Sequence, residues 1–303
     1  MQKMKKKIAI LCGVFVVFGT ISVANAHLPP GELFFAAQFP DNLVPTIDGE
    51  HSDWDILPES PYSIFNDRLF DPAQFQQAAR GEIDISDANI RHRFGWNENS
   101  NMIYLASQIY DNIHNIDRSF GDCHCLDDNW EIEINPDHSA SEEQNLEGNP
   151  VNNISYKWVV PPLDGVYQSI EPIGDLAWLS DDTEFVDMSW SFTGEQFGES
   201  TYFYEIRLIP IDALPREGAT PDNSSIHDLE EEEIIHMSVT MGDIDVEQAN
   251  HAYNGFWSLS PESCCKGVND FVMAPVEPAL EDLSAATAVE ETSWGHIKAG
   301  FDR

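Results

Sequence analysis

The chain has 303 residues, with 53 Asp and Glu side chains against 15 Lys and Arg, and its formal net charge is −38 at pH 7. So few cations cannot neutralise a phosphate backbone or an anionic membrane surface, which excludes general nucleic-acid binding and docking on acidic lipids. The acidity has three interpretations: a solvated surface, adaptation to salt, or a set of cation sites.

The first 26 residues have the organisation of a secretory signal peptide. A lysine-rich start precedes the apolar run from Ile8 to Ile21, and Ala24-Asn25-Ala26 is a small-x-small cleavage site. We expect cleavage after Ala26 and a secreted or periplasmic mature protein. The apolar run is too short to span a bilayer comfortably, so membrane insertion is not expected.

Four cysteines follow the signal peptide, in two compact pairs: Cys123 with Cys125, and Cys264 with Cys265. Export favours disulfides. Bridges within each pair would be strained, so the two possible cross-pairings are preferred. The first such bridge would close a loop of about 140 residues and stabilise the fold by about 4 to 5 kcal/mol. The alternative is a thiolate metal site with His124, which an oxidising compartment disfavours.

Alternating and β-rich stretches between turn residues predict seven strands. They cover residues 88–96, 102–110, 130–135, 154–160, 184–192, 202–209 and 234–241. The loop 97–101 predicts a hairpin between the first two. Many short strands with few helices predict an all-β protein, an antiparallel, jelly-roll-like β-sandwich.

One short helix is predicted as an insertion before the first hairpin, because Asp71 can cap it, Pro72 suits its first turn and Gly81 can end it. Within the strand 130–135, alternation places Glu131 and Glu133 on the face opposite to the apolar residues. That strand is therefore predicted to be half buried.

Four segments in order resemble the family 9 carbohydrate-binding modules. They are PTIDGEHSDW at 45–54, the hairpin region 94–111, DDNWEIEIN at 127–135 and YFYEIRLIPIDAL at 202–214. The resemblance extends from Pro45 to near Met273. It implies an antiparallel β-sandwich, recognition of plant-type polysaccharide units and, in some members, bound calcium. Trp130 and the two cysteine pairs depart from the family pattern.

Together with the signal peptide (1–26), the resemblance divides the chain into an N-terminal extension (27–44), the sandwich (45–276) and a C-terminal tail (277–303) that is expected to pack on it. The function that it implies is non-catalytic binding of an oligosaccharide or polysaccharide, in support of polysaccharide breakdown by a separate glycoside hydrolase.

Five carboxylates are candidate calcium ligands, because hard oxygen donors suit this ion. They are Asp48, Asp53, Asp127, Asp128 and Glu131. The alternative for Asp48 is structural: it caps backbone groups in a tight turn, while Gly49 takes a positive φ and Ile47 and Trp54 pack beneath.

Sugars stack on flat aromatic faces flanked by polar side chains. Trp54, Trp96 and Trp130 fall in buried alternation and are expected to pack in the core. Candidate sugar-binding residues are Trp178, Trp257, Tyr253 and Asn254, which lie near polar loop segments.

Two other functions stay open. Related sandwiches carry b-type haem in electron-transfer subunits, and Met237, Met241, Met273, Lys298 or a histidine could supply axial ligands. A glycoside hydrolase would need two carboxylates placed across the scissile bond, and acidic pairs are abundant in this chain.

Overall fold

The protein is described by a computed structural model that covers residues 29, 31–71, 84–117, 124–139, 149–152, 154–159, 167–171, 176–179, 183–246, 253–261 and 269–286. The strands of the main sheet are β1 (Leu33–Gln38), β2 (Ser63–Phe65), β3 (Ala88–Asn97), β4 (Met102–Asp111), β5 (Asn129–Asn135), β6 (Ile154–Val159), β7 (Tyr167–Glu171), β8 (Val186–Gly194), β9 (Ser200–Leu208), β12 (Ile234–Asp243), β13 (Gly255–Ser258) and β14 (Asn269–Val276).

The remaining elements are short. A separate ribbon pairs β10 (Ile211–Ala213) with β11 (Ser225–Ile226). The helical elements are η1 (Asp41–Leu43), η2 (His51–Ile56), α1 (Glu59–Tyr62), η3 (Asn66–Arg68), η5 (His124–Leu126), η6 (Ala177–Leu179) and η7 (Pro221–Asn223), and residues 278–286 are also helical.

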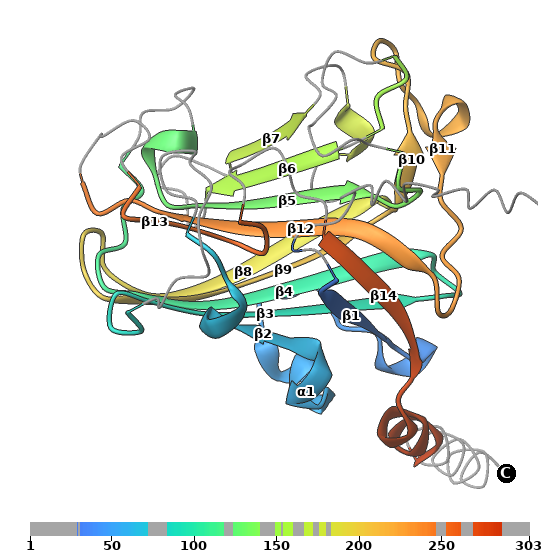
Figure 1. Cartoon of the computed structure of the whole chain (residues 1–303), viewed down its shortest axis with the longest axis horizontal. Helices are drawn as coiled ribbons and strands as arrows, with labels where there is room; N and C mark the ends of the chain where they lie inside the picture. Colours follow the sequence, from blue (N-terminus) through green and yellow to red (C-terminus); the bar gives the residue numbers. More distant parts are fainter. Residues whose placement is uncertain are drawn as a thin grey trace, which may run out of the picture.

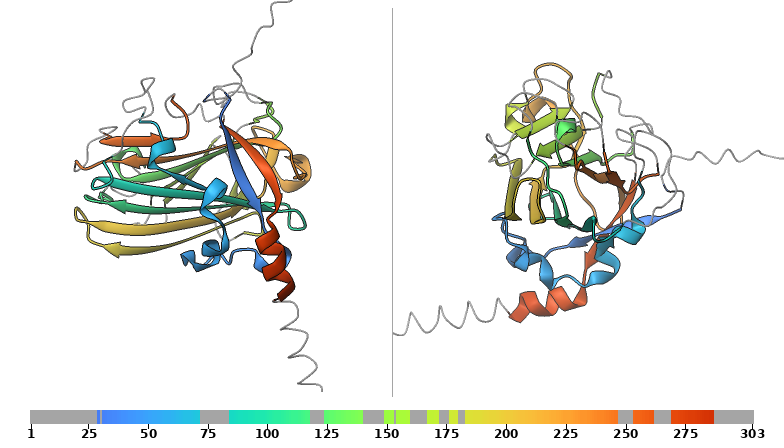
Figure 2. Two further views of the ribbon diagram at one scale, coloured as in Figure 1. Left: turned by 60° about the horizontal axis from the view of Figure 1, so that its bottom comes forward. Right: turned by 90° about the vertical axis from the view of Figure 1, so that its left-hand side faces the viewer.

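The main sheet curls back on itself to form two layers. Its strand order is β7-β6-β5-β12-β14-β1-β3-β4-β9-β8, with β13 paired to β12 and β2 paired to β3. One layer holds β5, β6 and β12, and the other holds β3, β4, β8 and β9 (Figures 1 and 2). Between the layers, β1 pairs in parallel with both β14 and β3. The predicted all-β sandwich is confirmed.

All seven predicted strands are present, with ends within two residues of the prediction. The predicted hairpin joins β3 to β4, and its loop is closed by the Ser100 N–H, which donates to Asn97 Oδ1 at 2.8 Å. Asn101 takes the left-handed conformation there, at φ +53°. An Asn tolerates that conformation better than most side chains, which explains its place in the turn.

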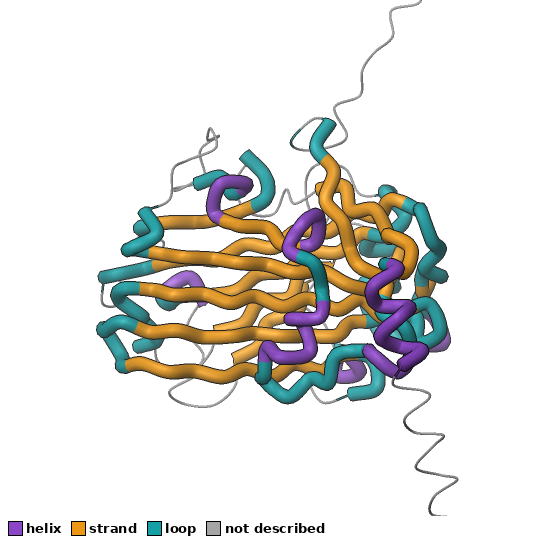
Figure 3. The backbone as a smooth tube through the Cα atoms, turned by 90° about the horizontal axis from the view of Figure 1, so that it is seen from below, coloured by secondary structure: helices purple, strands orange, loops and turns teal. Residues whose placement is uncertain are grey.

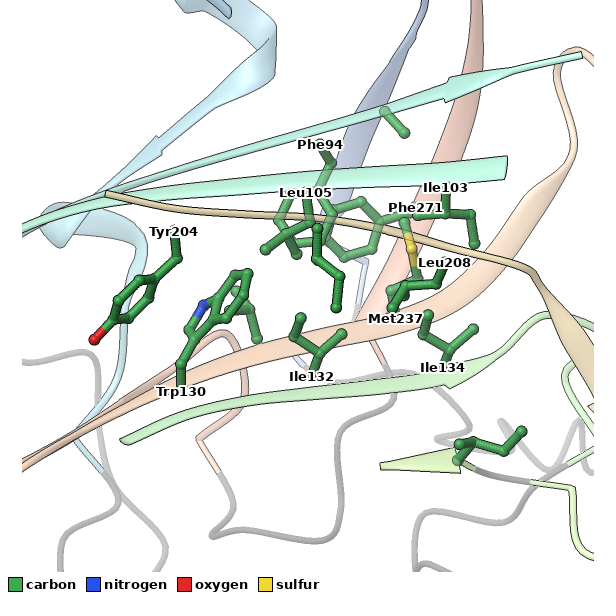
Figure 4. Close-up of a cluster of buried hydrophobic side chains, with 14 of the residues drawn as sticks. Phe94, Ile103, Leu105, Trp130, Ile132, Ile134, Tyr204, Leu208, Met237 and Phe271 are labelled. Carbon is green, nitrogen blue, oxygen red and sulfur yellow. The ribbon is translucent and has the colours of Figure 1, made fainter. Parts of the chain in front are cut away.

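The main core fills the space between the layers. Figure 4 shows Ile132 and Ile134 of β5 pointing toward Leu105 of β4 and Leu208 of β9. Each of these side chains is at most 3% exposed. The predicted packing tryptophans, Trp54, Trp96 and Trp130, are all 0% exposed, which confirms their role in the core.

The segment from Phe39 to Tyr62 covers part of the outer face of the β3–β4–β9 layer. Trp54, Leu57 and Tyr62 pack there on the outward side chains of β4 and β9, forming a second small core. Figure 3 shows this face from outside, with the helical turns in purple crossing only part of the orange strands. The outer face is therefore divided into a covered part and an open part.

The turn Asp48-Gly49 holds this covering segment against β9. The buried Glu205 carboxylate accepts the N–H groups of Asp48 at 2.7 Å and Gly49 at 2.6 Å, and Trp54 Nε1–H at 3.0 Å. Gly49 has φ +84°, and Asp48 Oδ1 accepts the Glu50 N–H at 3.0 Å, as the structural interpretation of this turn predicts. The segments 45–54 and 202–214, both part of the resemblance to family 9 modules, therefore meet at the Glu205 carboxylate.

The prediction of a half-buried β5 is wrong. Glu131 and Glu133 are each only 5% exposed, because β5 lies inside the sheet between β12 and β6, and every residue of the strand is buried. Alternation identified the core-facing side correctly, but it carries no information about what covers the other side.

Two other predictions fall mainly outside the described residues. The predicted helix occupies residues 72–81, beyond Asp71, whose Oδ1 accepts the Phe256 N–H at 3.2 Å. Of the paired cysteines, only Cys125 is described, and it is 2% exposed. The cross-pairing of Cys123 and Cys125 with Cys264 and Cys265 stays a prediction.

A buried histidine should make the fold sensitive to acid. His92 is 0% exposed, its Nδ1 lies 2.6 Å from Ser107 Oγ, and burial lowers its pKa from 6.5 to about 3. The unfolded chain binds this proton below pH 6.5 and the folded chain does not, so stability is lost as the pH falls from 6.5 toward 3. The loss from this group is about 5 kcal/mol over the full range.

The expected result is a shallower loss of unfolding free energy between pH 6.5 and 4 in His92→Gln than in the wild type, measured by urea unfolding at each pH. His51→Gln is the control, because His51 is half exposed beside Asp55. Equal slopes in His92→Gln and wild type would contradict the prediction.

Candidate functional site

A shallow hollow of about 240 Å³ lies on the open part of the outer face. Strands β2, β3, β4 and β9 contribute its walls, in a register that sets Phe65 beside Arg91, Arg91 beside Gln108, and Tyr110 between Asn89 and Thr201. The lining residues are Phe65, Asn89, Arg91, Gln108, Tyr110 and Thr201. All six side chains face away from the main core, because their strand neighbours Ile64, Ile90, Ile109 and Tyr202 point into it.

The hollow combines aromatic surface with polar groups held in place. Phe65 is 37% exposed and Tyr110 is half buried. Between them, Arg91 donates from Nη2 to Gln108 Oε1, which fixes the guanidinium over the strands. A fixed guanidinium keeps further N–H donors for a ligand. None of the six described lining residues is acidic, and the hydroxyl of Tyr110 donates a hydrogen bond to the Glu199 carboxylate.

A second group, here called the acidic centre, lies inside the sandwich where β4 and β12 end. It consists of Asp111, Asp128, Asp243 and Asp245 together with His114. Ligand atoms of Asp111, Asp243 and Asp245 lie within 4.8 Å of one another, and so do those of Asp111, His114 and Asp128. The three residues Asp111, Asp128 and Asp243 are each at most 2% exposed.

Some of these carboxylates have backbone partners. Asp128 accepts the N–H groups of Asn115 and Ile244, each at 2.7 Å, and Asp111 accepts that of Ile113 at 2.9 Å. Within the part of the chain that the structure describes, neither carboxylate oxygen of Asp243 has a hydrogen-bond partner, although both oxygens are buried. Among the described residues, the basic side chain paired with this centre is His114, at 3.3 Å from Asp128 Oδ2.

The electrostatics of the acidic centre favour protons or a bound cation. Burial, with the charges of Asp128 and Asp111, raises the pKa of Asp243 to about 9. Burial and the Asp111 charge raise the pKa of Asp128 well above its ordinary value. Burial, with Asp87 and Asp111, raises the pKa of Asp245 to about 6. Several buried carboxylates with so little countercharge are costly when ionised, and a cation would relieve that cost.

Of the five calcium ligands predicted from the sequence, the structure brings one into the acidic centre, Asp128. Asp127 and Glu131 are buried beside it in the chain but belong to none of the described metal-ligand groups. Asp48 and Asp53 lie in the N-terminal covering segment, where Asp53 Oδ2 accepts the Thr46 N–H at 2.9 Å. Asp111 and Asp243 were missed, although both stand at the ends of predicted strands.

The residues predicted to bind sugar do not line the hollow. Trp257 is 7% exposed and packs in the main core, and Tyr253 is 8% exposed and packs on Phe256. Trp178 is half buried against Phe185, and Asn254 is exposed beside Asp245. The hollow itself could have been found from the predicted hairpin, whose register pairs Asn89 with Tyr110 and Arg91 with Gln108.

The methionines considered as haem ligands lie in the main core. Met237, Met241 and Met273 are each at most 1% exposed. Lys298 lies outside the described residues. Among the described residues, no helix is long and apolar enough to cross a membrane.

The chain is similar in structure to a family 9 carbohydrate-binding module from Caldicellulosiruptor kristjanssonii. In its complex with cellotriose, that module shares 11% sequence identity over 82% of this chain and 96% of its own, with a TM-score of 0.45. In its complex with glucose, the same module shares 11% sequence identity over 81% of this chain and 97% of its own, with a TM-score of 0.43. No family model matches this sequence, and no curated protein matches it either. A likeness at this level says nothing of what this chain binds.

Proposed function

We propose that this protein binds a neutral oligosaccharide or polysaccharide, without cleaving it, in the hollow on the outer face of the sheet. The observation that carries the proposal is the lining of the hollow. Phe65 and Tyr110 offer aromatic surface for a pyranose ring, and Arg91, Gln108 and Asn89 offer donors and acceptors for hydroxyl groups.

Charge and chemistry narrow the ligand and the role. A chain with a net charge of −38 repels anionic polymers, which favours a neutral sugar. Glycoside hydrolysis requires two carboxyl groups across the scissile bond, and among the described residues the carboxylate next to the lining is Glu199, which accepts a hydrogen bond from Tyr110. The four sequence segments that resemble family 9 carbohydrate-binding modules support the same role.

The test is a glycan array followed by calorimetric titration of the sugars retained. Tyr110→Ala and Phe65→Ala are each expected to weaken binding by about 10-fold to 100-fold, because truncating a stacking side chain removes about 1.4 to 3 kcal/mol of binding free energy. Phe197→Ala is the matched control, since Phe197 is 41% exposed against 37% for Phe65 and lies outside the hollow.

Two outcomes would contradict the proposal. The first is a protein that retains no sugar. The second is a loss of binding in Asn254→Ala with none in Tyr110→Ala, which would place the sugar near residues 253–257 as the sequence suggested.

We further propose that the acidic centre holds a calcium ion with a structural role. The two unpartnered, buried oxygens of Asp243 are the supporting observation, and the donor set fits a hard cation because four of its five side chains are carboxylates. Asp111, Asp128, Asp243 and Asp245 would supply the oxygen ligands, and the ion would neutralise their mutual repulsion.

Export belongs to the same proposal. The basic start, apolar run and cleavage site of residues 1–26 support a secreted or periplasmic location for the mature chain. There it would meet polysaccharide, alongside a separate glycoside hydrolase. Fractionation of producing cells, with N-terminal sequencing of the recovered protein, tests this step. A cytoplasmic protein that begins before residue 27 would contradict it.

A further inference from the structure

His236, His138 and Asp270 meet at the end of β12 that is remote from the acidic centre. His236 pairs in register with Asn135 of β5 on one side and with Asp270 of β14 on the other. Its Nε2 lies 3.2 Å from Asp270 Oδ1. The turn that follows β5 returns over the sheet, so that the ring of His138 stacks on that of His236 with 3.7 Å between centroids and 12° between planes.

The backbone of this turn holds His138 in an uncommon conformation. His138 has φ +57°, and its N–H donates to the Asn135 carbonyl at 3.4 Å. Asp137 Oδ1 closes the turn by accepting from the Ser139 N–H at 3.0 Å and Asn135 Nδ2 at 3.1 Å. His, like Asn and Asp, is among the side chains that occur most often in left-handed backbone, so this position of the turn accepts His138 and places its imidazole over His236.

We propose that His138, His236 and Asp270 bind a divalent transition-metal ion of the zinc type. One ligand atom from each residue lies within 4.8 Å of the others. Two imidazole nitrogens and one carboxylate oxygen form a donor set that zinc, copper and nickel prefer, whereas calcium takes oxygen ligands. Imidazole lone pairs lie in the ring plane, so the ring of His138 turns out of its stack on His236 when both bind one ion. Among the described residues three side chains offer ligand atoms here, and water can complete a tetrahedral set.

The burial of the three residues suits an ion that enters from solvent and is then shielded. The side chains of His236 and Asp270 are 2% and 12% exposed. His138 is half buried and forms the outer member of the group. Because His138 lies on a turn and the other two ligands lie on paired strands, an ion here would tie that turn to the sheet.

This proposal does not depend on sugar binding or on the acidic centre. His236 and Asp243 are seven residues apart on β12, which corresponds to about 23 Å along an extended strand. The two centres also differ in chemistry, so calcium and zinc distinguish them.

The test uses the whole protein, freed of metal by a chelator and titrated with cobalt(II) as a spectroscopic stand-in for zinc. We expect one equivalent of Co²⁺ to give visible ligand-field bands, zinc to abolish them, and calcium to leave them unchanged. His138→Asn should weaken cobalt binding at least tenfold and remove the zinc-dependent rise in melting temperature. Asn suits the left-handed backbone of this position, so this variant should fold.

His227→Asn is the control variant. His227 is another half-buried histidine between carboxylates, with Nδ1 2.7 Å from Asp212 and Nε2 3.0 Å from Glu233, but it has no second histidine beside it in the described ligand groups. It should bind cobalt as the wild type does. The proposal is overturned if the wild type gives no bands, if His138→Asn binds equally well, or if His227→Asn alone loses binding.

Discussion

Millimolar calcium is expected to raise the melting temperature of the metal-free protein by about 5 to 10 °C. An ion that binds the folded state at a hundred times its Kd adds about 2.7 kcal/mol, and a domain of this size gains about 2 to 4 °C for each kcal/mol. The physical source is the attraction between the ion and the almost fully buried carboxylates of Asp111, Asp128 and Asp243, the last two of which exchange bound protons for the ion. Differential scanning calorimetry with and without calcium measures the shift.

Two variants make this expectation specific. Asp243→Asn should lose the calcium-dependent rise, yet its metal-free form should be about as stable as metal-free wild type. The pKa of about 9 keeps the Asp243 carboxyl protonated near neutral pH, so the amide replaces a neutral group of the same shape. Asp53→Asn should keep the calcium response, since Asp53 caps the backbone of the N-terminal segment, outside the acidic centre. A wild-type melting temperature that calcium leaves unchanged would remove the calcium proposal and leave the fold as described.

Gly49→Ala is expected to destabilise the protein by about 3 kcal/mol or more. The φ of +84° alone costs about 1 kcal/mol when a Cβ is added. In addition, that Cβ would lie 2.7 Å from the Trp190 carbonyl oxygen, which is backbone and cannot rotate away. The turn would have to move off β8, and Glu205 would lose the Gly49 N–H and leave a buried carboxylate less satisfied.

Gly218→Ala separates the cost of a positive φ from the cost of the contact between the new Cβ and the Trp190 carbonyl. Gly218 also has a positive φ, +64°, but no atom lies within 4 Å of the position its Cβ would take. It should cost only about 1 kcal/mol. Urea unfolding of the two variants gives the difference, and equal losses would show that the contact with Trp190 adds nothing.

The sequence predicts the strands that lie in antiparallel hairpins better than those at the junction of the layers. Alternation marks β3, β4 and β9 because one face is apolar and the other carries residues such as Arg91 and Thr201. By contrast, β1 has Phe34, Ala36 and Ala37 buried on both faces, so its short apolar run shows no alternation. The sheet begins at Leu33, which lies inside residues 27–44, the stretch expected from the sequence to be an extension outside the sandwich.

The candidate sites were less predictable than the strands for a related reason. A buried carboxylate has no local sequence signature that separates it from an exposed one, and this chain has 53 acidic residues. The segment 127–135 marks Asp128 as a candidate calcium ligand. Asp243 can be recognised as a candidate only from the fold, which brings its carboxylate close to that of Asp111. Flanking loop residues mark Trp257 as a candidate sugar-binding residue, yet its side chain packs in the core. They give no signal for Tyr110, which lies on a strand.

The position of β1 between β14 and β3 has a consequence for how the chain folds. Phe34 of β1 pairs with Phe271 of β14, so this strand near the start of the described chain can complete its pairing only after a strand near the end has formed. Contacts so distant in sequence raise the contact order, which slows folding and delays closure of the sheet. A nascent chain cannot complete the seam between its two layers before residue 271 has been synthesised. Until then β1 and residues 234–237 of β12 lack the neighbour that β14 later supplies, and their unpaired edges can aggregate.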